Sequence, residues 1–179
     1  MSDTYILTHS GRHFDFANPT TDMVCIEDIA TALAKECRYG GHCRGHYSVA
    51  QHSWLCANVV PEEYALEALL HDATEAYCKD LPRPLKRMLP GYAEVEERVD
   101  IVIRLKFALP VEHSAIVKEA DNRMLLTEQR DIMPPSEQWC GWDLNGLKPY
   151  EDIHIHPMPW AMAREEFMSF FRYLERRSV

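Results

Sequence analysis

The chain has 179 residues, which fits one domain, because two domains of half that length would be poorly cored. Hydrophobic residues make up 46% of the chain. It contains only 7 glycines, and this low number argues against a turn-rich β architecture. The net charge of −9 excludes the overall basic surface typical of proteins that bind nucleic acid polymers. No stretch approaches the roughly 18 apolar residues of a membrane helix, and no secretory signal is apparent. We therefore expect one cytoplasmic domain over residues 1–179.

The predicted elements are helices, and no segment is a convincing strand. Residues 1–24 are expected to be extended or irregular. Apolar residues recur at helical spacing over residues 28–37, 48–60, 62–79, 92–107, 112–132 and 160–176. Ser48 has the residue type of an N-cap, the DLPRP segment ends the third helix, and a long loop covers residues 133–157. The pattern predicts an all-α bundle of about six or seven helices.

Polar side chains occupy inward positions on three of these helices. His52 follows one apolar residue of its stripe by three positions and precedes another by four, so it points along the inward face. His71 and Asp72 are embedded in the apolar run of the next helix, and Asp121 lies on the apolar side of a later one. Each residue taken alone has an ordinary interpretation, as a packed histidine or as a capping or ion-paired aspartate. Three such coincidences together favour a shared metal ion.

The chemistry of this set indicates which ions it would hold. Burying an ionised carboxylate without a partner is very unfavourable, whereas two carboxylates neutralise one divalent cation. A mixed set of imidazole and carboxylate ligands suits Mn²⁺, Fe²⁺, Co²⁺ or Zn²⁺. The positions left open would take water and a phosphate oxygen, as a catalytic site requires. We therefore predict one divalent transition metal, held by His52, His71, Asp72 and Asp121.

Two further carboxylates are candidates for catalysis. Glu75 is four residues from His71 and three from Asp72, so on a continuous helix it would share their face and could orient or deprotonate the attacking water. Its alternative interpretation is a solvated helical glutamate. Asp80 lies at the end of this helix and is a candidate proton donor, although a turn-forming aspartate would be unremarkable there.

The ordered set of His52, His71-Asp72 and Asp121, with ALLHDATEAYCKDLPRPLK around the central pair, resembles the HD-domain phosphohydrolases. More narrowly it is similar to the bacterial 5′-deoxynucleotidases and the phage-type dATP triphosphohydrolases. The resemblance covers roughly residues 26–130. It implies a helical HD domain, the four metal ligands named above, and Glu75 and Asp80 as the catalytic carboxylates.

The resemblance also implies a substrate site. Arg38 matches an arginine that contacts phosphate or sugar, and Lys86 matches a phosphate-binding lysine, with Arg83 a weaker candidate. Tyr39 stands where the deoxynucleotidases commonly have a tryptophan against the nucleoside, so the aromatic platform is kept while base and sugar preference are left open. Without the resemblance, Arg38 and Lys86 would be interpreted as solvated surface charges.

The cysteines are spread over the chain without a repeated CxxC spacing, which predicts thiols rather than a disulfide framework. The loop that contains Cys37, His42, Cys43 and His46 could form a separate zinc site. Its spacing matches no regular zinc finger, and a loop that faces the substrate is the favoured interpretation.

The predicted activity is hydrolysis of a deoxynucleotide phosphate ester or anhydride by metal-activated water, with deoxyadenosine nucleotides among the best substrates. Mg²⁺ accompanying a triphosphate is left open, and the family implies a homo-oligomer. One alternative is an HD-type hydrolase of another phosphorylated metabolite, such as a cyclic or hyperphosphorylated nucleotide. Another is a non-catalytic HD-like nucleotide sensor, against which Glu75 and Asp80 argue, because a purely structural metal site has no use for a water-activating carboxylate.

Overall fold

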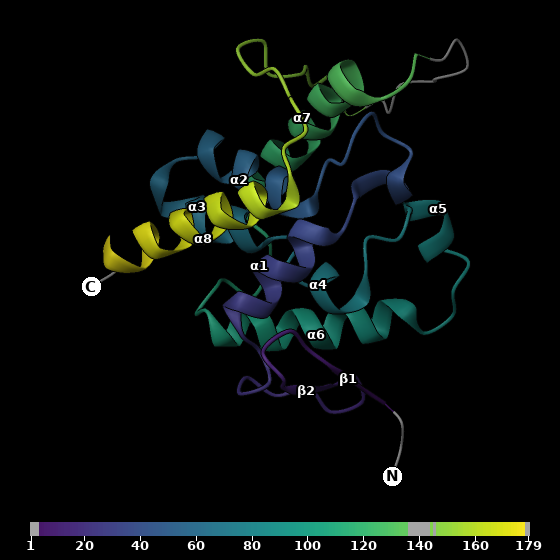
Figure 1. The fold of residues 1–179 in the computed structure, drawn as a ribbon, viewed down its shortest axis with the longest axis vertical. Coiled ribbons are helices and arrows are strands. Elements are labelled where there is room, and N and C mark those ends of the chain that lie inside the picture. Colours follow the sequence, from purple (N-terminus) through teal and green to yellow (C-terminus); the bar gives the residue numbers. More distant parts are fainter. Residues whose placement is uncertain (1–3, 136–143, 145, 178–179) are drawn as a thin grey trace.

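A computed structural model describes residues 4–135, 144 and 146–177, and its regular structure is almost entirely helical (Figure 1). The predicted all-α class is confirmed at this level. None of the described helices is long and apolar enough to cross a membrane. The described cysteines are free thiols, whereas Cys140 and part of the predicted loop over residues 133–157 lie outside the described residues.

A short hairpin precedes the helices and corrects the expectation that the chain has no strand. Strands β1 (Tyr5–Leu7) and β2 (His13–Asp15) pair in antiparallel register. The turn between them uses Gly11 at a φ of 81°, a conformation that glycine adopts without steric cost. Phe14 is fully buried and its ring stacks on that of Tyr77 at 3.9 Å, so one face of the hairpin is held against the helices.

The middle of the molecule is formed around one helix, α2. Helix α1 (Ile26–Lys35) is followed by a short 3₁₀ turn, η1 (Arg38–Gly41), and then by α2 (Val49–Val59). The predicted N-cap is confirmed, because the Ser48 side chain accepts a hydrogen bond from the backbone N–H of Gln51. Helix α2 contacts α1, α3, α7 and α8, so its polar side chains are enclosed from several sides.

The predicted helix over residues 62–79 is interrupted at residues 71–74. Helix α3 (Glu62–Leu70) ends before the histidine-aspartate pair, and α4 (Glu75–Cys78) begins after it. In between, backbone N–H groups bond to carbonyls three residues back, as in a 3₁₀ helix, which tightens the turn. A further short helix that was not predicted, α5 (Arg83–Lys86), begins within the DLPRP segment.

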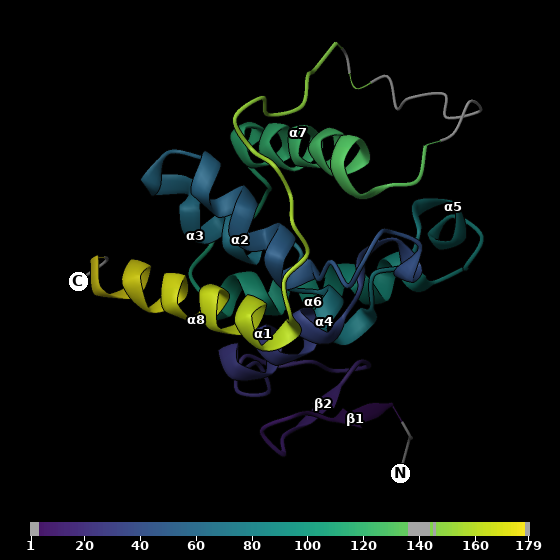
Figure 2. The same ribbon diagram turned by 45° about the horizontal axis from the view of Figure 1, so that its top comes forward.

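The remaining helices match the sequence period to within a few residues. They are α6 (Tyr92–Lys106), α7 (Ala115–Ile132) and α8 (Trp160–Arg177). Figures 1 and 2 both show α7 at one end of the molecule and the β1–β2 hairpin at the other, with α1, α2 and α8 between them. The main core lies among α1, α2, α3 and α8, and a smaller cluster lies where α2 meets α7.

Candidate metal centre

The four predicted ligands meet where α2, α7 and the turn between α3 and α4 come together. His52 is contributed by α2, His71 and Asp72 by the turn, and Asp121 by α7. The Nε2 atoms of His52 and His71 are 3.3 Å apart. The distance from His52 Nε2 to Asp121 Oδ1 is 3.2 Å, and that from His71 Nε2 to Asp72 Oδ2 is 3.3 Å. The two remaining imidazole–carboxylate distances are 3.6 and 3.8 Å.

Each of the two imidazoles is oriented by a hydrogen bond at its Nδ1 atom. His71 Nδ1 lies 2.7 Å from the backbone oxygen of Ala68, which can only accept, so Nδ1 carries the proton. His52 Nδ1 lies 2.5 Å from a carboxylate oxygen of Glu128 in the same manner. Each ring therefore turns Nε2 toward the centre. A histidine that ligates a metal is typically held by such a hydrogen bond at its other nitrogen.

The three shortest of these distances fit a shared ion. Metal–nitrogen and metal–oxygen bonds of about 2.0–2.2 Å place neighbouring ligand atoms roughly 3 to 3.5 Å apart. Two bare Nε2 lone pairs at 3.3 Å would repel each other unless a cation or protons lay between them. His52 is fully buried, so water cannot relieve that repulsion at its ring.

The electrostatics of the cluster favour positive charge at its centre. Burial alone would lower the pKa of His71, but Asp72 and Asp121 raise it to about 9. Burial alone would raise the pKa of Asp121, yet hydrogen bonds from His52 and His71 hold it well below its ordinary range. In the absence of a metal, protons on the imidazoles balance the carboxylates, and a divalent cation would take their place.

A sulfur atom adds a second possible donor set. The ligand atoms of His52, Cys56 and His71 all lie within 4.8 Å of one another, which is compatible with a bound metal. Cys56 Sγ is 3.6 Å from His52 Nε2 and 4.0 Å from Nδ1 of the same ring. The sulfur thus lies beside the ring rather than in line with the Nε2 lone pair. The carboxylates of Asp72 and Asp121 face both Nε2 atoms and are the better-placed partners.

The cluster opens into a cavity of about 480 Å³. Predicted site residues on its wall are Arg38, Tyr39, Asp72, Glu75, Asp80, Arg83, Lys86 and Asp121. Glu75 Oε2 is buried and has no hydrogen-bond partner among the described residues. Burial, reinforced by Asp72 and Asp80, raises the pKa of Glu75 well above its ordinary value. Although α3 and α4 are separate helices, Glu75 and Asp72 still line one cavity.

The predicted phosphate-binding cations differ in their surroundings. Arg38 is buried and its Nη1 lies 3.2 Å from Asp72 Oδ2, so it already belongs to the cluster. Lys86 lines the cavity, but its Nζ donates to Glu96 at 2.6 Å. A phosphate bound by Lys86 would therefore compete with Glu96 for the ammonium group.

No protein-family model matches the chain. It is 45% identical to Escherichia coli K12 YfdR, described as uncharacterized, over 172 residues that make up 96% of each chain. This chain belongs to the YfdR family. An uncharacterized protein of Rhodobacter capsulatus, RCAP_rcc00048, is 38% identical over 121 residues, or 62% of each chain.

In this YfdR-family chain the cysteine–histidine loop does not assemble the alternative zinc site. Cys37 Sγ and Cys43 Sγ are 3.9 Å apart. His42 and His46 are exposed, and the closest described partner of the His46 ring is the backbone oxygen of Lys35, at 3.5 Å. Within the described part of the chain, no third donor joins the two sulfurs to complete a group.

Glu128 is the residue of the centre that the sequence reasoning missed. It is fully buried on α7, seven residues after Asp121 and therefore about two turns along the same face. An acidic residue on that apolar stripe was the available signal. The pattern alone did not show that its partner is His52, on a helix 76 residues away.

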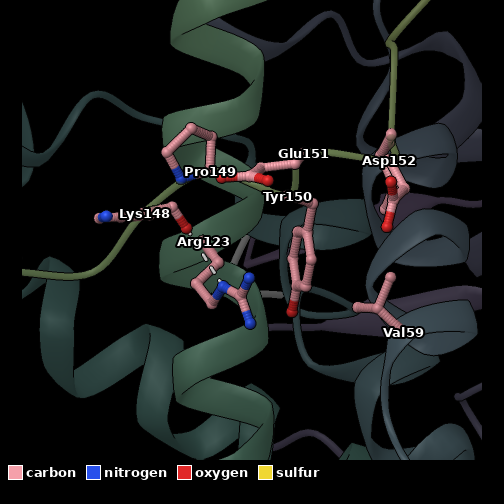
Figure 3. A pocket seen from close by; sticks show the side chains of 8 residues that line it. Val59, Arg123, Lys148, Pro149, Tyr150, Glu151 and Asp152 are labelled. Carbon is pink, nitrogen blue, oxygen red and sulfur yellow. Dashed lines mark hydrogen bonds between the residues drawn. The ribbon is translucent and has the colours of Figure 1, made fainter.

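A second hollow of about 540 Å³ lies between α7 and residues 148–153 of the YfdR-family fold (Figure 3). Arg123 is its central cation, and the guanidinium carbon is 4.0 Å from the centre of the Tyr150 ring. Arg123 Nε also donates to the backbone oxygen of Lys148 at 3.1 Å. These contacts hold the 148–153 segment on α7, and they give Arg123 a structural role.

Proposed function

We propose that this chain is a metal-dependent phosphohydrolase of the HD type that acts on deoxynucleotide phosphates. The observation that carries the proposal is the convergence of two Nε2 atoms and two carboxylates from α2, α7 and the α3–α4 turn, at separations of 3.2–3.8 Å. An enclosed group of this kind is stable when it shares a cation.

His52, His71, Asp72 and Asp121 would hold one divalent transition metal, with Mn²⁺, Fe²⁺, Co²⁺ and Zn²⁺ all suited to the ligand set. When bound, such an ion supplies a Lewis acid for a phosphate oxygen and makes a nearby water molecule more acidic. The two carboxylates offset the charge of the ion, so the centre can remain largely buried. The cavity gives a substrate access to it from one side.

In this proposal Glu75 acts on the attacking water. Its Oε2 lacks a partner among the described residues and lies on the wall of the cavity, next to Asp72. A carboxylate whose pKa is raised is a stronger base, which favours proton transfer from water near neutral pH. Asp80 lines the same cavity and is the proposed donor of the proton to the leaving oxygen.

The substrate side of the proposal rests on the cations and the aromatic ring of the same cavity. Arg38, Arg83 and Lys86 lie on the wall of the cavity, where a phosphate could replace the carboxylates that now pair with Arg38 and Lys86. Three cations exceed the need of a monophosphate, which favours triphosphates. The Tyr39 ring lines the cavity beside Arg38 and could lie against a deoxyribose, leaving little room for a 2′-hydroxyl.

The experiment that tests the proposal is product analysis with Mn²⁺-, Co²⁺- or Zn²⁺-loaded protein and a panel of dATP, dAMP, ATP, AMP and the other deoxynucleotides. We expect deoxynucleotides to be hydrolysed faster than ribonucleotides. Release of intact triphosphate would place the attack at the α-phosphorus, whereas inorganic phosphate from dAMP would indicate a 5′-nucleotidase. No hydrolysis of any of these nucleotides would contradict the proposal and favour another phosphorylated metabolite or a sensor.

The metal ligands are tested separately by Cys56→Ser. Because the sulfur lies beside the ring of His52, we expect this variant to keep its metal. Loss of the metal from Cys56→Ser, with Asp72→Ala and Asp121→Ala unaffected, would replace the carboxylate ligands by the cysteine.

A further inference from the structure

Glu128 joins the proposed metal centre to the turn that carries Arg38 and Tyr39. The described hydrogen-bond partners of its carboxylate are all side chains, namely Arg38, Tyr39, Tyr47 and His52. Oε1 accepts from His52 Nδ1 at 2.5 Å and from the Tyr47 hydroxyl at 2.9 Å. Oε2 accepts from the Tyr39 hydroxyl and from Arg38, whose Nε and Nη2 both lie at 3.3 Å. One carboxylate therefore contacts the metal side through one oxygen and the turn through the other.

The Oε1 side determines how His52 is presented. A carboxylate that accepts the Nδ1 proton fixes the tautomer and the orientation of the ring and makes Nε2 a better donor to a metal. Removal of such a partner typically weakens metal binding about 10- to 100-fold. His52 and Glu128 are both fully buried, so water cannot take the place of the lost carboxylate.

The Oε2 side holds a strained turn. Tyr39 has φ 59° and ψ 26°, in the left-handed region that a bulky residue rarely adopts. Such a conformation persists only where the surroundings fix it. The hydroxyl of Tyr39 and the guanidinium of Arg38, its neighbour in the turn, are both fixed by Glu128.

We propose that Glu128 is a positioning residue that couples metal binding to the conformation of the Arg38–Tyr39 turn. The inference rests on the proposed function, since it takes a metal ion bound to His52 as given. Because coupling between two sites is reciprocal, a metal at His52 stabilises the turn, and an ordered turn favours the metal. Loss of the carboxylate weakens both together.

The first test measures Co²⁺ binding to Glu128→Gln. Co²⁺ is titrated into the protein, and its visible absorption bands are recorded. The variant keeps the shape of the side chain but can no longer accept from both groups of donors. We expect about 10- to 100-fold weaker Co²⁺ binding and altered bands, in a protein that still unfolds cooperatively. The matched control is Glu67→Gln, a buried carboxylate on α3 whose partner is Ser114, and we expect it to bind Co²⁺ as wild type does.

The second test needs no variant and reports on the turn itself. Cys43 is buried beneath the turn, with Sγ 3.7 Å from the Arg38 backbone oxygen. Peptide-resolved labelling of this thiol should become several-fold faster when the metal is chelated from wild-type protein. In Glu128→Gln and in Tyr39→Phe, labelling should be fast with or without metal.

The outcomes separate this inference from the proposed function. Wild-type protein that binds no transition metal would remove the metal centre and this inference with it. Wild-type protein that binds Co²⁺ would support the metal centre, and the results for the variants would then test the role of Glu128 alone. Unchanged Co²⁺ affinity and bands in Glu128→Gln would overturn its role. If that variant does not fold, wild-type protein still provides a test. A Cys43 labelling rate that is the same before and after metal removal would overturn the coupling.

Discussion

Two groups of acidic side chains lie about one helical turn apart near the end of α3, one at Glu67 and one at Asp72 and its neighbour His71. Both groups contact residues of α7 or of its N-cap. At the first, Glu67 is buried, and its oxygens accept from the backbone N–H and the hydroxyl of Ser114, each at 2.7 Å. Ser114 is the residue before α7, so this carboxylate satisfies one backbone N–H at a helix start. The charge also lies favourably at the positive end of the helix.

The second centre lacks such complementary donors. Asp72 and Asp121 face two imidazoles whose Nδ1 atoms are already occupied, and the Nε2 atoms face each other. Arg38 reaches only one of the two carboxylates among the described contacts. A buried carboxylate is therefore not by itself a sign of a site. What distinguishes the second centre is that its groups are balanced only when a cation or protons are added.

The largest expected effect is loss of the metal. Wild-type protein should hold about one transition-metal ion per chain, and His71→Ala and Asp121→Ala should each hold almost none, because each removes a ligand from a four-ligand site. Elemental analysis of the purified variants measures this, with Glu67→Ala as the comparison that keeps its metal. If both ligand variants kept as much metal as wild type, His71 and Asp121 would not be metal ligands, and the second centre would not differ from the first in this respect.

Glu75→Ala should separate binding from chemistry. The residue contacts the cavity but is not a proposed ligand, so the metal should stay while turnover falls on the order of 100-fold or more. Turnover is measured on protein of known metal content, against the best nucleotide of the panel. Asp80→Asn should also be impaired. Near wild-type turnover by metal-loaded Glu75→Ala would refute its role as the base.

The metal affinity should depend on pH. Since the pKa of His71 is raised to about 9 in the metal-free protein, the ring is protonated at neutral pH, and a metal must displace that proton. The apparent affinity should therefore rise with pH, by about tenfold per unit for each displaced proton, until the pKa is passed. Co²⁺ titrations between about pH 6 and 8 test this. A flat profile would mean that no proton is released.

The smallest effect is expected at the first centre. Glu67→Ala leaves the N–H and hydroxyl of Ser114 without their acceptor, which should lower the free energy of unfolding by about 1–3 kcal/mol. Denaturant unfolding measures this loss, and metal content and turnover should be unchanged. A Glu67→Ala variant that lost its metal while remaining folded would show that the two centres are not independent.

Much of the centre was predictable because helical periodicity identifies inward positions. The spacing around His52 and Asp121 placed both side chains inward, and the structure places them 3.2 Å apart. The Ser48 cap and the bounds of the later helices follow from equally local rules. The roles of Glu75 and the predicted phosphate-binding side chains remain proposals.

Only the tertiary structure decided which inward residues meet. The pairing of Glu128 with His52 and of Lys86 with Glu96 depends on how separate helices are placed against one another. The interruption of the predicted helix at residues 71–74 and the β1–β2 hairpin also required it. The physical reason is that a residue's spacing along its own helix encodes the direction of its side chain. The distance to a side chain on another helix is determined by packing between segments far apart in the sequence.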